Sequence, residues 1–270
     1  MKTFLLALIG FFFLCNVNSQ SFTKITAGGL VNDGASSFAV SWCDYDNDND
    51  LDLFVGNVYS ESDFLFRNNG NGTFVQNASG PLVTDSATSE VAAWGDYDND
   101  GDEDLFLSVG GGAGALNRLY KNEGGGNFTS ITTGVVVNDV SSSIGAAWAD
   151  YDNDGFLDLF VANYNNQNNF LYHNDGNGNF SKIITGSIVN DGGNSVGCGW
   201  ADYDNDGFQD LFVANYSGQS NFLYHNNGDG TFSKITAGAV VNDVGNYHGC
   251  SWGDYNNDGF LDLFVSNSVN

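Results

Sequence analysis

Trp148-Ala-Asp-Tyr-Asp-Asn-Asp-Gly-Phe-Leu-Asp-Leu-Phe160 is the stretch that decides the fold, because close copies of it recur along the chain. The first Asp of successive copies stands at positions 44, 96, 150, 202 and 254, which gives a period of 52 to 54 residues. Each copy begins with a tryptophan, and these are all the tryptophans of the protein: Trp42, Trp94, Trp148, Trp200 and Trp252. A fixed period of this length is typical of repeat proteins in which each unit forms one structural module.

Each unit predicts four short strands joined by tight turns. The first strand ends at the tryptophan and the second contains a Leu-Phe-Val segment. The third contains Phe-Leu-Tyr, as at 170–172, and the fourth contains Thr-Phe-Ser-Lys-Ile, as at 231–235. The second strand is apolar on consecutive residues, so both of its faces should be covered by neighbouring sheets. No segment shows the helical apolar period. We therefore predict an all-β fold, a β-propeller of four-stranded blades. A parallel β-helix is the alternative, but its rungs are much shorter than this period.

The repeats set the expected organisation of the chain. We expect a signal peptide at 1–19 and a β-propeller domain at 20–270, with repeats at 22–73, 74–127, 128–179 and 180–231 and a partial repeat at 232–270. The last repeat stops after its second strand, while residues 22–25 resemble a fourth strand. Either the fifth blade is three-stranded or the chain is a fragment of a larger propeller. The fragment is favoured, because an open sheet edge invites aggregation.

The first nineteen residues read as an export signal. Lys2 precedes an apolar run from Phe4 to Cys15, and small polar residues lead to a cleavage point before Gln20. The run is too short to cross a membrane, and no later segment approaches the required length. The sequence thus predicts a secreted or cell-surface protein without a transmembrane segment.

The charge balance excludes one class of partner. Of 270 residues, 33 are acidic and 7 are Lys or Arg, giving a formal net charge of −26. Nucleic-acid binding needs many basic side chains and is excluded. Hydrophobic residues make up 41% of the chain, enough for a packed core, so the acids are not those of a disordered acidic segment.

The cysteines beyond the signal segment are Cys43, Cys198 and Cys250. An odd number in an exported protein raises the possibility of a reactive thiol. In the other repeats, however, their places hold Gly, Ala or Val. We therefore expect small buried side chains rather than a redox site.

The loop after each first strand carries the chemistry. Carboxylates at positions 1, 3, 5 and 9 of one tight turn repel each other unless a cation lies between them, and Ca²⁺ accepts six to eight oxygens in a flexible shell. A glycine at position 6 permits the turn, and the backbone carbonyl of position 7 would add an oxygen. Five calcium sites are predicted, with these residues at positions 1, 3, 5, 7 and 9: Asp44, Asp46, Asp48, Asp50 and Asp52; Asp96, Asp98, Asp100, Asp102 and Asp104; Asp150, Asp152, Asp154, Phe156 and Asp158; Asp202, Asp204, Asp206, Phe208 and Asp210; Asp254, Asn256, Asp258, Phe260 and Asp262.

An EF-hand, a plain turn without metal and a Mg²⁺ site are the three alternatives to this calcium-binding turn. An EF-hand needs a bidentate Glu at position 12 between two helices, but in the third copy that place is Val161 within a strand. Plain Asp- and Asn-rich turns are common, although five copies of the same ligand spacing argue against them. Mg²⁺ demands a stricter octahedron than Ca²⁺. Asn49 at the glycine place should tolerate the left-handed backbone, and Asn256 should weaken the fifth site because it lacks a charge.

The repeated motif Trp-x-Asp-Tyr-Asp-Asn-Asp-Gly-x-x-Asp-Leu-Phe closely resembles that of the FG-GAP/VCBS repeat family, which is related to the calcium-bearing blades of integrin α-chain propellers. The resemblance covers about 22–270 of this chain. It implies a secreted propeller with Ca²⁺ in the first hairpin of each blade, often used for adhesion or glycan binding.

The loops at the other end of the strands offer a candidate recognition face. Strand one runs toward the acidic loop and strand two runs back, so the loops after strand two and the connectors between repeats share the opposite face. Tyrosine and amide side chains suit recognition of sugars or peptides. The candidate ligand-binding residues are Tyr59, Tyr164, Asn165, Tyr216, Tyr247 and His248, and solvated loops are the alternative.

No catalytic constellation is evident. His173 and His225 share one repeat position, held by Arg67 and Lys121 in other repeats, and no nucleophile or zinc motif appears. We expect no catalytic residues and a non-catalytic role, binding an extracellular glycan or protein with up to five Ca²⁺ ions in the blades. A calcium-dependent polysaccharide lyase is the alternative, since fold alone does not decide function.

Overall fold

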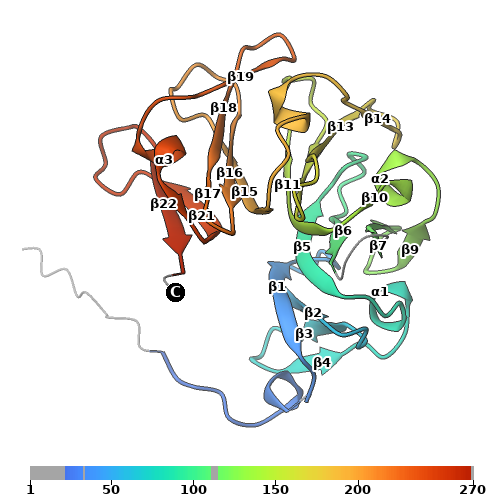
Figure 1. Ribbon diagram of the computed structural model, residues 1–270. Coiled ribbons are helices and arrows are strands. Elements are labelled where there is room, and N and C mark those ends of the chain that lie inside the picture. Colours follow the sequence, from blue (N-terminus) through green and yellow to red (C-terminus); the bar gives the residue numbers. More distant parts are fainter. Residues whose placement is uncertain (1–21, 33, 111–114, 269–270) are drawn as a thin grey trace, which may run out of the picture.

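A computed structural model describes residues 22–32, 34–110 and 115–268 of the chain. It confirms the all-β propeller architecture: sheets of antiparallel strands stand side by side around a central axis (Figure 1). The strands of the five blades are β1 (Ser37–Cys43), β2 (Asp52–Asn57), β3 (Phe64–Asn68) and β4 (Phe74–Gln76); β5 (Ser89–Gly95), β6 (Asp104–Val109), β8 (Arg118–Asn122) and β9 (Phe128–Ile131); β11 (Ser143–Ala149), β12 (Asp158–Asn163), β13 (Phe170–Asn174) and β14 (Phe180–Lys182); β15 (Ser195–Ala201), β16 (Asp210–Asn215), β18 (Phe222–Asn226) and β19 (Phe232–Lys234); and β21 (Tyr247–Gly253) with β22 (Asp262–Asn267).

The first strand of each blade lies innermost. β1, β5, β11, β15 and β21 contact one another in sequence, and the second, third and fourth strands follow outward in each four-stranded sheet. In β6, β12 and β16 every residue is buried, as expected for an apolar strand covered on both faces by neighbouring blades. The core therefore consists of successive layers between blades rather than one central cluster.

Three of the tryptophans, Trp148, Trp200 and Trp252, join their blade to the preceding one. The indole Nε1 of Trp148 donates to the backbone oxygen of Ala93 at 3.0 Å, and the ring stacks on Tyr97 with an interplanar angle of 13°. Trp200 and Trp252 make the same contacts one and two blades further along. Trp42 has no blade before it and is 54% exposed. The single tryptophan per repeat thus serves the interface between blades.

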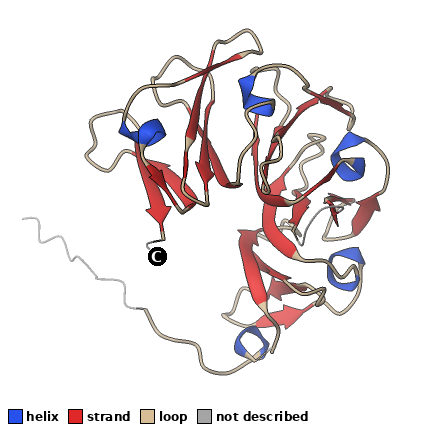
Figure 2. Cartoon of the chain, viewed as in Figure 1, coloured by secondary structure: helices blue, strands red, loops and turns tan. Residues whose placement is uncertain are grey.

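The connectors contain short helical turns that the sequence did not predict. They are α1 (Pro81–Thr84), α2 (Val135–Asn138), α3 (Ala239–Asn242) and the 3-10 turns Gly29–Val31 and Ser187–Val189. Figure 2 shows them on the outer rim of the arc. Two further pairs of short strands join the loop after a second strand to the connector before the next blade: β7 (Ala115–Leu116) with β10 (Val140–Ser141), and β17 (Gln219–Ser220) with β20 (Val244–Gly245).

Two details differ from the expected boundaries. The fourth strand of each complete blade pairs with the third strand before it, so the first sheet extends to Gln76 and crosses the expected repeat boundary at 73/74. Within the described residues, the fifth blade contains only β21 and β22, and residues 22–26 form no strand. The expected signal segment lies outside the described residues. In the part of the chain described, no helix is long and apolar enough to cross a membrane.

The three cysteines among the described residues lie in the packing between blades and form no disulfide with one another. Cys43 is buried in the first core cluster, as predicted, and burial raises the pKa of its thiol to about 12. Cys198 and Cys250 are partly buried at the edges of two other clusters. A thiol with a raised pKa is a poor nucleophile, which agrees with a packing role.

Candidate functional site

The acidic loops connect the first and second strands of all five blades and share one backbone conformation. Position 4 is Asn in every loop and has a positive φ, from 59° at Asn47 to 61° at Asn205. Position 6 is also left-handed, at 92° in Gly155 and 71° in Asn49. The prediction that Asn49 tolerates the glycine place is confirmed. The two left-handed positions produce the sharp turn that brings the carboxylates together.

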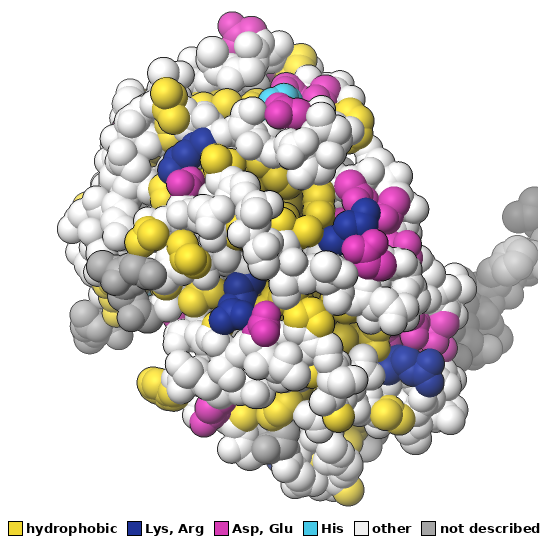
Figure 3. Space-filling view, turned by 90° about the vertical axis from the view of Figure 1, so that its right-hand side faces the viewer, with side chains coloured by type: hydrophobic (Ala, Val, Ile, Leu, Met, Phe, Trp, Pro, Cys, Tyr) yellow, Lys and Arg dark blue, Asp and Glu magenta, His cyan; other side chains and the backbone are white. Residues whose placement is uncertain are grey.

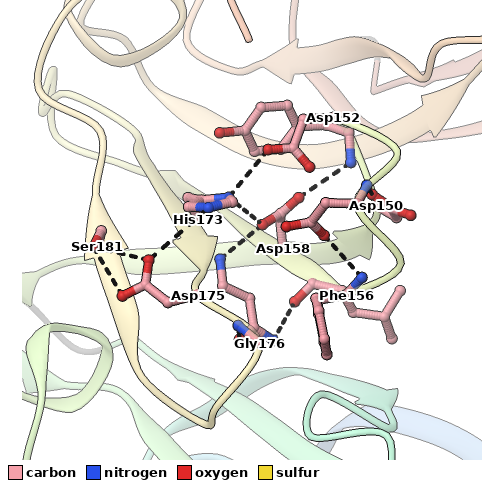
Figure 4. A network of polar contacts seen from close by, with 12 residues as sticks. Asp150, Asp152, Phe156, Asp158, His173, Asp175, Gly176 and Ser181 are labelled. Carbon is pink, nitrogen blue, oxygen red and sulfur yellow. Dashed lines mark hydrogen bonds and ion pairs between the residues drawn. The ribbon is translucent and has the colours of Figure 1, made fainter.

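The third loop shows how the acids are oriented (Figure 4). The two oxygens of Asp150 accept backbone N–H groups of Asp154 and Gly155 at 3.0 and 2.9 Å. Asp158, from the start of β12, accepts the N–H of Tyr151 at 3.2 Å. The loop backbone thus holds its own carboxylates in place, as it does in the equivalent bonds of the other loops.

The arrangement brings ligand oxygens together and leaves some without a partner. Oxygens of Asp44, Asp46 and Asp48 lie within 4.8 Å of one another, as do those of Asp96, Asp98 and Asp104, and of Asp150, Asp152 and Asp154. In each of these three loops, Oδ1 of the position-3 residue is buried without a hydrogen-bond partner: Asp46, Asp98 and Asp152. The Oδ2 atom of Asp52, a residue only 1% exposed, is also unpartnered. Buried polar atoms are rarely unsatisfied, so the loops fit a cation with oxygen ligands.

Burial of the position-9 acids makes the ionised form of their carboxyl groups less stable. Desolvation raises the pKa of Asp104 and Asp158 to about 7, and those of Asp52 and Asp210 to about 6, against hydrogen bonds that lower them. A bound cation would offset this cost, because an opposite charge nearby favours the ionised carboxylate.

A basic residue from the third strand reaches into four of the loops. Arg67 lies 3.7 Å from Asp46, and Lys121 pairs with Asp98 and Asp100. The rings of His173 and His225 contact the equivalent acids, with His173 Nδ1 3.3 Å from Asp152 and 3.2 Å from Asp158. Figure 3 shows the basic side chains on one face bordering acidic ones. The repeat position of the two histidines is therefore part of the acidic site.

The fifth loop is less enclosed than the others. Asp262 is partly exposed, whereas its counterparts Asp104, Asp158 and Asp210 are completely buried. The amide oxygen of Asn256 accepts the N–H of Asp258 at 2.8 Å. The loop keeps its turn, but its position-3 residue, Asn256, carries no charge. This missing charge is the reason for predicting a weaker calcium site.

Two sets of asparagines that sequence reasoning missed link the loops to one another. The position-4 amides donate to the glycine carbonyl of the next loop, for example Asn99 to Gly155 at 2.9 Å and Asn153 to Gly207 at 3.0 Å. At the end of the third strands, buried Asn122, Asn174 and Asn226 donate to the preceding blade. The recurrence of Asn at position 4 in all five copies was the signal that could have identified the first set.

The opposite end of the sheets carries the predicted recognition residues. Tyr164 and Tyr216 follow β12 and β16, with ring centroids 6.5 Å apart, and the ring of His248 lies 5.0 Å from that of Tyr216. Asn165 is exposed beside this group, whereas Tyr59 is 81% exposed and does not line the cavity that the other three share.

Tyr247 requires a correction. Its side chain is 8% exposed and packs with Phe212, Ala214 and Val241, so it cannot face a ligand. β21 begins at Tyr247, whose side chain lies on the core side, while the side chain of the next residue, His248, is exposed.

Comparison with known families identifies the repeat. The FG-GAP-like repeat matches four overlapping segments, 44–107, 96–161, 150–213 and 202–265. These segments cover most of the chain, and each runs from one acidic loop through the next.

Comparison with individual proteins gives more distant relationships. Over 160 residues the chain is 29% identical to cartilage acidic protein 1 of Xenopus tropicalis, covering 56% of this chain and 25% of that protein. The structure resembles an Agrocybe aegerita lectin described as recognising non-reducing terminal N-acetylglucosamine, with a TM-score of 0.58, 18% identity, and coverage of 86% of this chain and 61% of the lectin. It also resembles the Vibrio cholerae biofilm matrix protein Bap1, with a TM-score of 0.45, 17% identity, and coverage of 86% and 35%. The chain thus spans less than two thirds of each of these proteins.

Proposed function

Since this chain belongs to the FG-GAP-like repeat family, we propose that it is a calcium-binding β-propeller that recognises an extracellular partner without catalysing a reaction. The proposal includes export by the segment 1–19 and a single propeller domain at 20–270. The observation that carries it is the pairing of two features at opposite ends of the same sheets: acidic loops with unpartnered oxygens, and a group of aromatic rings.

The metal in this proposal is Ca²⁺, held by the acids at positions 1, 3, 5 and 9 and the carbonyl at position 7. The support is the oxygen-only donor set in the turn together with the three repeat-equivalent orphan oxygens. Calcium would supply positive charge that neutralises the crowded carboxylates. Up to five ions would be bound, with the fifth loop weakest.

The partner in this proposal is a glycan or a protein bound through Tyr164, Tyr216 and His248. Tyrosine rings provide apolar contact area with a polar edge, which suits sugar faces. In contrast, among the described residues every Lys and Arg except Lys24, which lies far from the cavity-lining residues in the sequence, is within 4.0 Å of a carboxylate. This pairing disfavours the alternative of a lyase acting on an acidic polysaccharide, which would need free cationic groups.

Two measurements test the proposal. Thermal unfolding in calcium and in EDTA tests the metal: a ligand at a hundred times its Kd stabilises the folded state by about 2.7 kcal/mol per site, so melting should fall strongly with chelator. Equal melts in both conditions contradict calcium binding.

Binding to a glycan array tests the recognition surface, with terminal N-acetylglucosamine among the probes. Replacing both Tyr164 and Tyr216 by Ala should abolish any calcium-dependent signal. Tyr59→Ala is the matched control, because this tyrosine is exposed but lies outside the shared cavity. Retained binding in the double variant places recognition elsewhere.

A further inference from the structure

A cavity of about 370 Å³ lies at the inner ends of the blades, opposite the acidic loops. Figure 1 shows the strands that surround it facing the centre of the arc. Its walls are mainly apolar, and its lining residues are Phe38, Glu90, Val91, Ile144, Tyr164, Val196, Tyr216 and His248.

Five of these residues hold one repeat position, the second residue of each innermost strand: Phe38, Glu90, Ile144, Val196 and His248. The strand register shifts at this point in every blade, for example between Ser143 and Gly145, which identifies the residue between them as the extra residue of a β-bulge. A bulge redirects a side chain that regular alternation would place elsewhere. The repeated bulges therefore direct five side chains toward one cavity.

Glu90 is the exception among these five residues. The others are apolar or aromatic, whereas Glu90 places a carboxylate in an apolar wall between Val91 and Ile144. The side chain is half-buried, and desolvation raises its pKa. Within the described residues, no hydrogen bond or ion pair involves this carboxylate. A half-buried charge without a partner is costly, so the position favours a ligand of opposite charge.

A second departure from the repeat makes room for this carboxylate. The residue after the second strand is Tyr164 in blade three and Tyr216 in blade four, but Gly110 in blade two, as the matching backbone bonds to Thr88, Ser142 and Asn194 show. A Cβ atom at Gly110 would overlap Glu90 Oε1. Gly110 thus leaves room for the carboxylate of Glu90 in the same blade.

We propose that this cavity binds a small organic cation with an alkylated ammonium group, its charge beside Glu90 and its methyl groups against the rings of Phe38, Tyr164 and Tyr216. Alkylated ammonium ions are weakly hydrated and interact favourably with aromatic faces. An anion finds no free cationic side chain here. The proposal rests on the proposed function in that both use the same tyrosines.

Calorimetric titration with two isosteric probes tests the charge requirement. Choline and 3,3-dimethyl-1-butanol have the same shape, but only choline is charged. We expect choline to bind at least tenfold more tightly to the full chain in saturating calcium. Glu90→Gln should weaken choline at least tenfold and leave the neutral alcohol unchanged.

Two further variants serve as controls, one for folding and one for the removal of an acid outside the cavity. Glu90→Val copies the side chain that blade four carries at Val196, so it should fold and should also lose choline. Glu123→Gln removes one exposed acid from the same blade outside the cavity, and should leave choline binding unchanged.

The outcomes separate this inference from the proposed function. Equal binding of the two probes, no choline binding, or undiminished choline binding in Glu90→Gln overturns the organic-cation site. None of these results affects calcium-dependent glycan binding, which the tyrosine variants test separately. Choline binding lost in Glu90→Gln while array binding persists supports a cation site within the recognition surface.

Discussion

The side-chain amide of Asn174 donates to the backbone oxygen of Tyr97, 2.6 Å away and 77 residues earlier in the chain. The backbone N–H of the same residue donates to Asp158 in its own acidic loop at 2.8 Å. One completely buried asparagine therefore connects the acidic loops of two adjacent blades.

This link gives the first prediction. Asn174→Ala should lower the free energy of unfolding by about 1–3 kcal/mol, because it leaves the buried Tyr97 carbonyl without this donor. Asn68→Ala is the matched control: Asn68 makes the same bonds within blade one, to Leu51 and Gly70, but has no preceding blade to contact. Urea denaturation in calcium measures both, and equal losses would contradict a role between blades.

Asp63 supplies a prediction about pH. Its buried carboxylate accepts the N–H of Asn57 and the hydroxyl of Ser89, and desolvation raises its pKa to about 6. Because the folded pKa lies above the unfolded value, the folded state loses stability as the pH rises from about 4 to 6. The other blades carry Asn117, Asn169 and Asn221 at this place, accepting the equivalent backbone N–H.

Asp63→Asn should therefore raise the free energy of unfolding by about 1–3 kcal/mol at pH 7, and the gain should shrink toward pH 4. Comparing variant and parent at each pH cancels the titration of the calcium ligands, which both share. A gain that is constant with pH would show that burial of this charge is not its source.

The second loop gives a prediction about metal affinity. Lys121 places its ammonium between Asp98 and Asp100, where it competes with a divalent cation for the same carboxylates. Lys121→Met should strengthen calcium binding in calorimetric titration. Arg67→Met in the first loop should have a smaller effect, because Arg67 is about half exposed and 3.7 Å from its acid. Weaker binding in Lys121→Met would mean that the lysine supports the metal site.

The fifth loop gives a prediction about which calcium site loses its ion first. Asn256→Asp restores the missing carboxylate and should convert the weakest site into one like the others. Asp204→Asn makes the reverse change in the fourth loop and should create a second weak site. Titration of the calcium-free protein with Ca²⁺ distinguishes strong from weak sites. Unchanged calcium affinities in both variants would show that the charge at position 3 does not contribute to binding.

The repeated motif was sufficient to predict the blades, their strand order and the acidic loops, including the left-handed backbone at Asn49. These features depend on local spacing and turn chemistry, which the sequence displays directly. The motif also placed Tyr164 and Tyr216 in loops after second strands, at the end of the sheets opposite the acidic loops.

The bulges and the inter-blade bonds could not be predicted in this way. Strict alternation does not show which residue of an innermost strand is the extra one. Tyr247 was expected in a connector on the face opposite the acidic loops, but β21 begins at this residue and its side chain lies in the core. The significance of Glu90 depends on Gly110 and on residues from three other blades. Such a relationship becomes visible only when the blades are assembled.

The position-4 asparagines have a consequence for how the arc takes up metal. Each amide fixes the glycine carbonyl of the following loop, from Asn47 and Gly101 at 3.3 Å to Asn205 and Gly259 at 3.1 Å. Ordering one loop therefore orders part of the next before any ion arrives there. If the loops hold Ca²⁺ as proposed, we expect them to fill in a nearest-neighbour process, as in a one-dimensional lattice, with a steeper saturation curve than independent loops would give.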